Sequence, residues 1–289
     1  MGTISDKLNK IITTKEAIRT AINSKGGTLT ESDTFASYSS AIDSLPSGGG
    51  GTDWLKEFLD ETKDASYLFC GYSAYDYGKD TIWKKKLTYE TLQKALKYDT
   101  TRNVTNMTGM FYYCSQLTTI PSIYTSLVKD MSNMFYSCSN LTTISQLDTN
   151  NVTNMRKMFN YCSNLITIPQ LDTSKVTNMS YMFYQCNKLR TIDITYMNIT
   201  SVTYNDSFAS ECNSLTKLII RNMNTILPLN SNAFNNCYHF TGTTNSKYNP
   251  HGLKDGRIYV PDDKVDALKT ATNWSKYADI IVPLSTLVE

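Results

Sequence analysis

Hydrophobic positions recur at a nearly constant interval between residues 101 and 240. Each unit carries Val, Met, Phe, Cys, Leu and Ile at matching places, separated by polar residues. The cysteines mark the period most clearly, at Cys114, Cys138, Cys162, Cys186, Cys212 and Cys237. The first four are 24 residues apart, and the next two follow after 26 and 25. A fixed period between about 20 and 30 residues is typical of a solenoid in which each repeat forms one coil.

Two segments of each unit predict local structure. The Met-Phe-x-x-Cys segment predicts one short helical turn, and the Leu-Thr-Thr-Ile segment predicts a β-strand. Stacked strands would form one long parallel sheet along the solenoid. The phenylalanines that precede the cysteines are expected to share one core position, and they are Phe111, Phe135, Phe159, Phe183, Phe208 and Phe234. The sequence therefore predicts an α/β repeat with coils of about 24 residues.

Polar residues also follow the period. Asn106, Asp130, Asn154 and Asn178 recur once per coil, and we expect them to bond the backbone of a turn and to stack as a ladder. The variable positions between Phe and Cys are rich in tyrosine, which offers a flat apolar face with a polar tip. The candidate ligand-binding residues are therefore Tyr112, Tyr113, Tyr136, Tyr161 and Tyr184. The alternative interpretation is that these tyrosines only pack over the next coil.

The organisation of the chain follows from where the repeat begins and ends. We expect an N-terminal helical docking or oligomerisation module at 1–46, a Gly-rich linker at 47–52, a cap at 53–100, the repeats at 101–240 and a C-terminal cap at 241–289. A linker of consecutive glycines has no means of packing and marks a boundary. A helical unit of about 45 residues buries little area, so we expect it to need a partner or self-association.

Composition excludes several classes of partner. The net charge of +2 gives no electrostatic footprint for nucleic acid or an anionic membrane. No stretch is long and apolar enough to insert into a membrane. The first residues lack the basic start and apolar run of a secretory signal, so we expect a chain that is made in a cytoplasm and not exported alone. Cysteines placed on the period of a fold are expected to be buried, reduced packing residues.

Catalytic chemistry has little support in the sequence. His239 and His251 are the two histidines, and neither has a Ser, Cys or carboxylate at a spacing that signals catalysis. The adjacent carboxylates Asp262 and Asp263 are better interpreted as the N-cap of a helix at 264–270. No His/Cys cluster has zinc-ligand spacing. We therefore expect no catalytic residues, no metal and no cofactor.

The repeat unit at 176–192, VTNMSYMFYQCNKLRTI, resembles the BspA-type leucine-rich repeat, found in surface proteins of gut bacteria and mycoplasmas. Residues 258–285 resemble the segment that closes such arrays. Residues 13–51 resemble a short module near the start of phage tail or fibre-associated proteins. These resemblances imply a leucine-rich-repeat solenoid, with a docking unit in front of it.

The combination of docking unit, linker and solenoid leads to a functional hypothesis. We expect a non-enzymatic bacteriophage virion structural protein, assembled in the host cytoplasm and attached to other virion proteins through residues 1–46. The solenoid would be displayed as a fibre, decoration or adhesin that binds a host-surface glycan or protein, and self-association would give a homo-oligomer. The alternative is a leucine-rich-repeat adhesin on a bacterial cell surface.

Overall fold

The computed structural model describes the repeats and the C-terminal end almost continuously, with scattered residues before them. The described residues are 16, 18–20, 22–23, 28–29, 59–60, 63–66, 68–69, 92–93, 96, 100–196, 206–223 and 230–288. Residues 18–20 and 22–23 are helical, and Ile18 and Ile22 are buried. The helical module as a whole and the linker at 47–52 lie outside the described residues.

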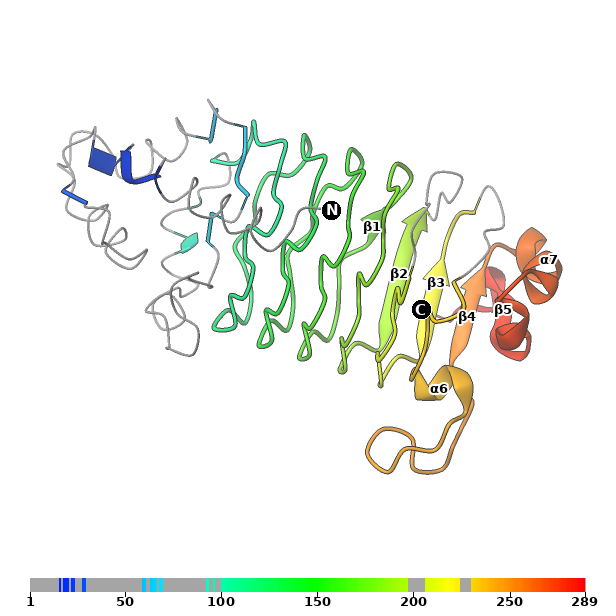
Figure 1. Cartoon of the computed structure of the whole chain (residues 1–289). Helices are drawn as coiled ribbons and strands as arrows, with labels where there is room; N and C mark the ends of the chain where they lie inside the picture. Colours follow the sequence, from blue (N-terminus) through cyan, green and yellow to red (C-terminus); the bar gives the residue numbers. More distant parts are fainter. Residues whose placement is uncertain are drawn as a thin grey trace.

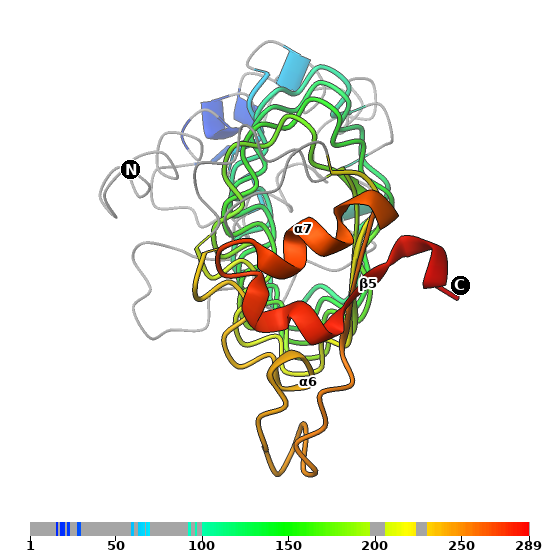
Figure 2. The ribbon, with the colours of Figure 1, turned by 90° about the vertical axis from the view of Figure 1, so that its right-hand side faces the viewer.

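The repeats stack as coils into an elongated solenoid (Figure 1), and the view along the stack shows the coils nested one behind another (Figure 2). A ladder of parallel bridges joins one polar residue from each coil, and its members are Asp64, Asn106, Asp130, Asn154 and Asn178. Asp64 thus places a further coil before residue 101, within the segment predicted as a cap. The predicted polar ladder is confirmed.

Each ladder residue also shapes its own turn. The side-chain oxygen of Asn154 accepts a hydrogen bond from the Arg156 N–H at 3.1 Å, and Asp130 does the same for the Ser132 N–H at 2.8 Å. Between coils, the Asn154 amide donates to the Asp130 carboxylate at 3.0 Å. A side chain that bonds the backbone two residues on fixes a turn without a helix or sheet. The repeat of Asn or Asp is therefore explained by local backbone geometry.

The Met-Phe-x-x-Cys segment forms tight turns, and the prediction of a helical turn is wrong. The residue before each cysteine has a left-handed backbone, with φ of 62° at Tyr161 and 60° at Gln185. Alternate N–H groups point to the next coil, so Phe135 donates to the Met158 carbonyl at 2.9 Å. A helical turn would instead use these groups within its own segment. Bonding between coils decides the local conformation.

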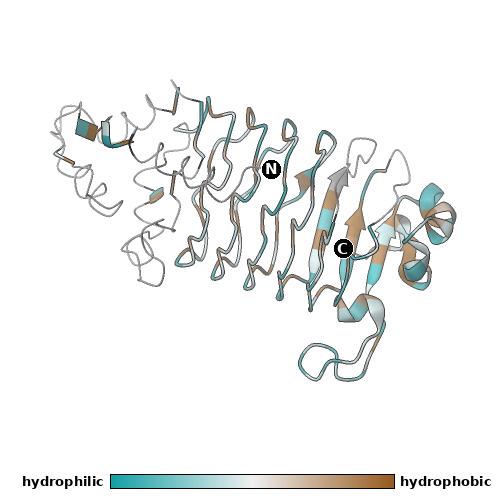
Figure 3. Cartoon of the chain, in the orientation of Figure 1, coloured by the Kyte–Doolittle hydropathy of each residue, from teal (hydrophilic) through white to brown (hydrophobic). Residues whose placement is uncertain are grey.

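The parallel sheet is present, but it is confined to the C-terminal part of the array. Its strands, in sequence and spatial order, are β1 (Leu171–Asp172), β2 (Thr191–Tyr196), β3 (Lys217–Ile220), β4 (Arg257–Val260) and β5 (Ile281–Pro283). All neighbouring pairs are parallel. Along residues 191–194 of β2, hydrophilic and hydrophobic residues alternate (Figure 3), which matches the alternation of side chains across a strand.

The Leu-Thr-Thr-Ile segments of the earlier coils lie side by side, but too few backbone hydrogen bonds join them to form β-strands. Thr142 donates its N–H to the Thr118 carbonyl at 2.9 Å, and Ile166 donates to Thr142 at 3.0 Å. The prediction of a strand in every coil is therefore wrong. Pro121 and Pro169 follow two of these segments and lack the N–H that a further rung requires. The segment at 141–144 is followed by Ser145, which keeps its N–H, so proline alone does not account for the missing ladder.

Phenylalanine rings form the centre of the core. Between Phe111 and Phe183 the ring centroids are 5.4 to 5.5 Å apart and neighbouring planes differ by 2° to 6°. Phe69 continues this stack from the coil before, 5.7 Å from Phe111. These rings are buried. Because the coils repeat at a constant interval there, identical side chains meet in identical orientations.

Phe208 departs from the alignment expected from sequence. It lies four residues before Cys212, whereas the other phenylalanines lie three before their cysteine. The Phe183 N–H donates to the Phe208 carbonyl, the position that Met182 occupies towards Phe159. Phe208 therefore takes the methionine place, and Ala209 takes the phenylalanine place. The planes of Phe183 and Phe208 are accordingly perpendicular, at 90°.

The cysteines of the repeat are free and buried, as predicted. Each thiol donates to a backbone carbonyl of the preceding coil; Cys162, for example, bonds the Phe135 carbonyl at 3.0 Å. The same carbonyl accepts the Cys138 N–H at 3.1 Å. Burial raises the pKa of the Cys162, Cys186 and Cys237 thiols. Cysteine thus fills a small apolar place while satisfying a carbonyl.

The C-terminal elements cover the last coil. They are α6 (Tyr238–Thr241), η1 (Asp262–Lys264), α7 (Val265–Thr270), η2 (Ser275–Ile280) and η3 (Leu284–Thr286). Trp274 is fully buried, and the Tyr277 ring meets the Phe234 ring edge-on at 5.6 Å. Figure 2 shows α7 lying across the end of the stack. Among the described residues, no helix has the length and apolarity to span a bilayer.

Asp262 does not cap α7, so that prediction is wrong. The cap position is Lys264, with no side-chain bond to the helix. The Asp262 carboxylate instead accepts the Ser285 N–H at 3.1 Å, and bonds from Ser285 lower the pKa of Asp262. A short 3-10 turn at η1 separates the carboxylate from the helix start. Asp262 therefore holds the chain end against the start of the cap.

Candidate functional site

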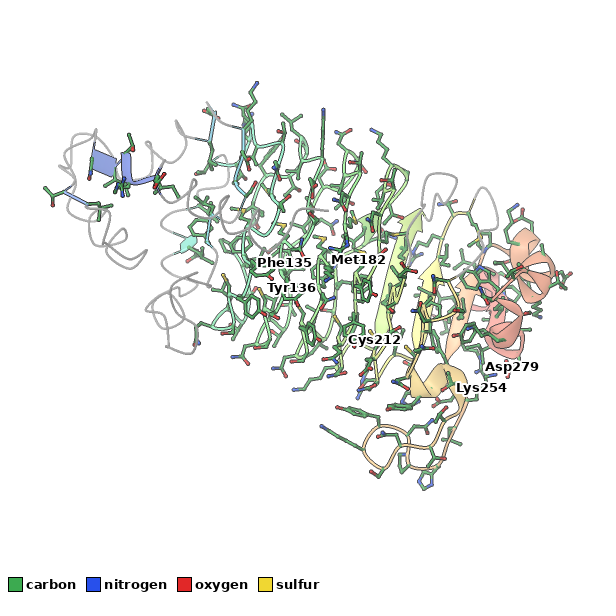
Figure 4. All side chains as sticks on the ribbon, viewed as in Figure 1. Phe135, Tyr136, Met182, Cys212, Lys254 and Asp279 are labelled. Atoms are coloured by element: carbon green, nitrogen blue, oxygen red, sulfur yellow. The ribbon has the colours of Figure 1, made fainter. Side chains whose placement is uncertain are left out.

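The five tyrosines singled out from sequence lie together on the surface of the array. With Tyr181 they form a continuous row of aromatic rings across successive coils, which we call the tyrosine strip: Tyr112, Tyr113, Tyr136, Tyr161, Tyr181 and Tyr184. Tyr161 is exposed, with 38% of its surface accessible, and the others are partly buried. Tyr136 is labelled in Figure 4, beside Phe135 of the core.

The turn before each cysteine explains how these rings reach the surface. Phe135 points into the core, and the next residue of the extended turn, Tyr136, emerges on the other side. Tyr113 and Tyr161 occupy the left-handed position directly before their cysteines, with φ of 60° and 62°. A left-handed backbone costs an ordinary residue roughly 1–2 kcal/mol. In the coil of Tyr112 and Tyr113, the turn thus directs both tyrosines outward, between the buried Phe111 and Cys114.

Ring contacts join the tyrosines from coil to coil. Tyr112 and Tyr136 stack with centroids 4.8 Å apart and planes at 15°. Tyr161 then meets Tyr136 at 5.9 Å and Tyr184 at 5.6 Å, both edge-on. The rings of these pairs therefore pack against those of the neighbouring coil. The packing also leaves part of each ring accessible, so it does not exclude binding.

Tyr181 and Lys157 complete the site and were missed from sequence. Both lie five residues before a cysteine, and the Lys157 ammonium lies 5.9 Å from the Tyr136 ring centre and 5.5 Å from that of Tyr181. This separation is within the range of a cation–π interaction. The sequence signal was available, because aligning the repeats shows that this position varies from coil to coil. Only the stacking of coils shows that the side chain five residues before the cysteine faces the tyrosines.

Burial favours the neutral form of two phenols in the strip, Tyr136 and Tyr184. Burial raises the pKa of Tyr136 to about 12, helped by the neighbouring Tyr113 and Tyr161. Burial also raises the pKa of Tyr184, and the Glu211 carboxylate adds to the effect. The strip therefore carries a positive charge at Lys157 in its middle and a negative charge near its C-terminal end. Its phenol groups remain hydrogen-bond donors at neutral pH.

Asn160 interrupts the tyrosine column. It takes the place that Tyr136 and Tyr184 take in neighbouring coils, and it is 2% exposed. Its amide donates to the Tyr181 carbonyl at 3.3 Å, while its own side-chain carbonyl has no hydrogen-bond partner in the described part of the chain. The Tyr161 ring lies between Tyr136 and Tyr184 at this point. A neighbouring tyrosine thus fills the gap that asparagine leaves.

The histidines lie elsewhere, at the C-terminal end of the array. The His239 ring nitrogen lies 2.7 Å from the Asp255 carboxylate and ties together the two ends of the loop at 242–256. His251 belongs to the same loop. Nearby, Lys254 binds Asp279 at 2.8 Å, a pair labelled in Figure 4. Each of these contacts is accounted for by anchoring the loop to the cap.

Within the described residues, no group of three or more His, Cys, Asp or Glu side chains is placed to hold a metal ion. The chemistry on offer in the strip is aromatic stacking, hydrogen bonding by phenols and one ammonium charge. These are the means of binding a polar ligand with apolar faces. The structure therefore makes the tyrosine strip the candidate binding surface.

Comparison with known proteins gives one family match. The family described as "Mycoplasma protein of unknown function, DUF285" matches residues 85–167 and, in an overlapping second match, residues 129–248. The two matches together span 85–248, more than half of the chain and all of the tyrosine strip. No curated protein and no solved structure matches. The matched region does not reach residues 13–51, so the likeness of that segment to phage proteins gains no support here.

Proposed function

The chain belongs to the family described as "Mycoplasma protein of unknown function, DUF285", and from this we propose a non-enzymatic adhesion protein whose solenoid binds a cell-surface ligand through the tyrosine strip. The family is a repeat family with no assigned activity, which leaves the function to be argued from the surface. The BspA-type resemblance of the repeats supports the same assignment at a coarse level.

The observation that carries the proposal is the continuous tyrosine strip itself. Six tyrosines from four coils converge on one side of a rigid array, between core residues that fix their backbone. Tyrosine supplies rigid contact area at a low entropy cost together with a hydrogen-bonding tip. A solenoid offers such a row along its whole length, because every coil repeats the same outward position.

The proposal predicts the effect of removing the strip. The triple variant Tyr112→Ala, Tyr136→Ala and Tyr184→Ala should lose binding to cells of the source host, measured by flow cytometry with labelled protein. The core residues beneath are untouched, so circular dichroism and thermal unfolding should show a folded array. A suitable control is Leu127→Ala with Ile166→Ala, which removes exposed apolar side chains outside the strip. Undiminished cell binding by the folded triple variant would contradict the proposal.

We propose virion display as the first candidate for the carrier, with residues 1–46 docked on other virion proteins, because 13–51 resembles a phage tail or fibre-associated module. Display on a bacterial cell is the second candidate. The family description favours this second candidate, because it names mycoplasma, a bacterium, and not a phage. Both carriers present the same strip to a host or neighbouring surface, so the binding proposal does not depend on the choice.

Mass spectrometry separates the two carriers. Purified phage particles and washed host envelopes from the source culture would be compared for peptides of this chain. Stoichiometric presence in intact particles supports virion display. Recovery from the envelope, with no peptides in the particles, rejects virion display and supports the cell-surface adhesin.

A further inference from the structure

The middle of the tyrosine strip holds a positive charge that the other coils lack. Lys157 extends over the rings of Tyr136 and Tyr181, at 5.9 and 5.5 Å from their centres. The corresponding residues of the other coils, five before each cysteine, are Gly109, Asn133, Tyr181, Ser207 and Asn232. The charge is therefore a property of one coil and is not required by the repeat.

The backbone at this position makes the choice of lysine notable. Five of the six residues at this position, all except Asn232, have a left-handed conformation, with φ of 58° at Lys157 and 59° at Tyr181. Glycine and asparagine adopt it most easily, and the chain uses them at Gly109 and Asn133. Long side chains occur in the two neighbouring coils where they contact each other. A strained position occupied by a costly residue suggests a functional reason.

The charges around the strip indicate where an anion would sit. The raised pKa values of Tyr136 and Tyr184 keep the phenols neutral, so they do not repel an anion. Glu211, beside Tyr184, marks the end of the strip where an anion is disfavoured. Lys157 lies two coils away from that carboxylate along the array. The favourable place for a negative group is therefore the centre of the strip.

We propose that the tyrosine strip binds an acidic glycan, with sugar rings stacked on the tyrosines and the acidic group of the glycan on Lys157. This inference rests on the proposed function and names the ligand class of that same site. Phenol hydroxyls and the lysine donate hydrogen bonds to sugar oxygens, while the aromatic faces contact the apolar faces of the sugar rings.

The size of the surface favours a glycan over a protein. Aromatic side chains present at most about 250 Å² each, so six tyrosines that expose about two-fifths or less show below roughly 600 Å². A standard protein interface needs about 800 Å² per partner and a wide patch. The strip is instead a single row along the coils, which suits a linear chain of sugar rings.

The test measures binding of matched sugars by isothermal calorimetry with the full chain. The probes are 3′-sialyllactose, a glucuronate-containing oligosaccharide and neutral lactose. One charge-assisted contact corresponds to about tenfold in affinity, so we expect the acidic probes to bind about tenfold tighter than lactose. Lys157→Asn should abolish that preference, so that the acidic probes bind no more tightly than lactose. Glu211→Gln should tighten binding of the acidic probes.

Lys175→Asn is the matched control, because it removes the same charge from an exposed lysine that bonds Asn151 at 2.7 Å instead of the tyrosines. Asparagine already occupies the position of Lys157 in the preceding coil, at Asn133, so the Lys157 variant should fold. Thermal unfolding verifies that both variants fold. Each should unfold at or above the temperature at which the unchanged protein unfolds.

Two results would overturn the inference. Equal affinity for acidic and neutral sugars contradicts it, and so does an equal effect of Lys157→Asn and Lys175→Asn. If no sugar binds while the tyrosine variant still abolishes cell binding, the inference fails and the proposed function stands with a protein ligand. If the tyrosine variant leaves cell binding intact, the proposed function fails as well.

Discussion

The coils at 104–186 and the elements at 206–283 build one array in two different ways. In the first region the period is 24 residues, the phenylalanine planes are nearly parallel and the sheet is almost absent. In the second the spacing rises to 26 and 25, the rings meet edge-on, and β3, β4 and β5 pair in a ladder. The parallel stacking of rings in the first region thus gives way to edge-on ring contacts and paired strands in the second.

Buried threonines show how far the first region depends on repeated side chains. Thr125 donates its hydroxyl to the Asp148 carbonyl at 2.9 Å, and the same hydroxyl accepts the Asp148 N–H at 2.8 Å. Thr149 repeats the pair with Asp172. A hydroxyl that is both donor and acceptor replaces a rung of backbone pairing. The threonine can make this pair of bonds only where successive coils have the same length, because both bonds join residues 23 positions apart.

Between Phe111 and Phe234, the phenylalanine rings stack in parallel only where successive coils have the same number of residues. Phe208 lies one place earlier than its counterparts, and Ala209 fills the place that it leaves. Where the insertions begin, identical residues no longer meet, and the paired strands β2, β3 and β4 hold the coils together. The comparison can be tested in both regions.

The largest effect is expected at the stacked ring of Phe159. Phe159→Ala should lower the free energy of unfolding by about 3–5 kcal/mol, since it leaves a cavity in a buried stack. Urea unfolding followed by circular dichroism measures this. In the second region, Phe208→Ala should be partly rescued by adding Ala209→Phe, which restores the register of the first region. Absence of any rescue would show that the edge-on arrangement is itself required.

The thiols predict a loss of stability at alkaline pH. Folding raises the pKa of Cys162, Cys186 and Cys237 above the ordinary 9.0, because burial favours the neutral thiol. Their stabilising effect is therefore complete below pH 9.0 and is lost as the pH rises from there through the raised folded-state pKa. Each thiol contributes about 1.4 kcal/mol per pH unit over that interval. Unfolding free energies measured between pH 7 and 11 verify this.

The control for the alkaline prediction is Cys162→Ala, which removes one titrating group. Its unfolding free energy should fall less steeply with pH than that of the unchanged protein. A thiol reagent should label the folded chain slowly at pH 8 at the repeat cysteines, because they are buried and neutral. Equal slopes in the two proteins would contradict the assignment of the effect to the thiols.

A smaller effect is expected for the ion pair of the sheet region. Two guanidinium nitrogens of Arg221, Nε and Nη2, donate to the Asp193 carboxylate, the shortest contact at 2.8 Å; Arg221 directly follows β3 and Asp193 lies in β2. Arg221→Met should lower the unfolding free energy by no more than about 1 kcal/mol, because both side chains remain partly exposed to water. The loss should shrink in 0.5 M salt, and an unchanged loss would point to packing of the arginine stem.

The smallest effect concerns the two prolines that end the strands of the first region. Replacing Pro121 and Pro169 by serine supplies a backbone N–H at each position, which could donate a further hydrogen bond to the preceding coil. The gain of about 1 kcal/mol per hydrogen bond is offset by the greater freedom of the unfolded chain, so stability should change little. Hydrogen exchange should show newly protected amides at 121 and 169. Fast exchange there would show that proline is not what limits the sheet.

Much of the fold was predictable because it depends on local residues at a fixed interval. The coils, the buried cysteines and the ladder through Asn106 and Asn154 follow from period and residue type. The helical turn at Met-Phe-x-x-Cys was predicted wrongly, because bonds to the next coil outweigh local propensity. The prediction of five tyrosines located the candidate site, while Lys157 and Tyr181 were missed.

The sequence by itself determined the period, and with it the stacking of coils, the placement of phenylalanine and cysteine inside, and the outward tyrosines. Only the tertiary structure decided which residues of different coils meet. Lys157 lies over Tyr136 because the left-handed backbone turns it there, and the extended segments pair as a sheet only from β1 onward. Contacts within a coil depend on residues close in sequence, whereas contacts between coils depend on the register of the whole stack.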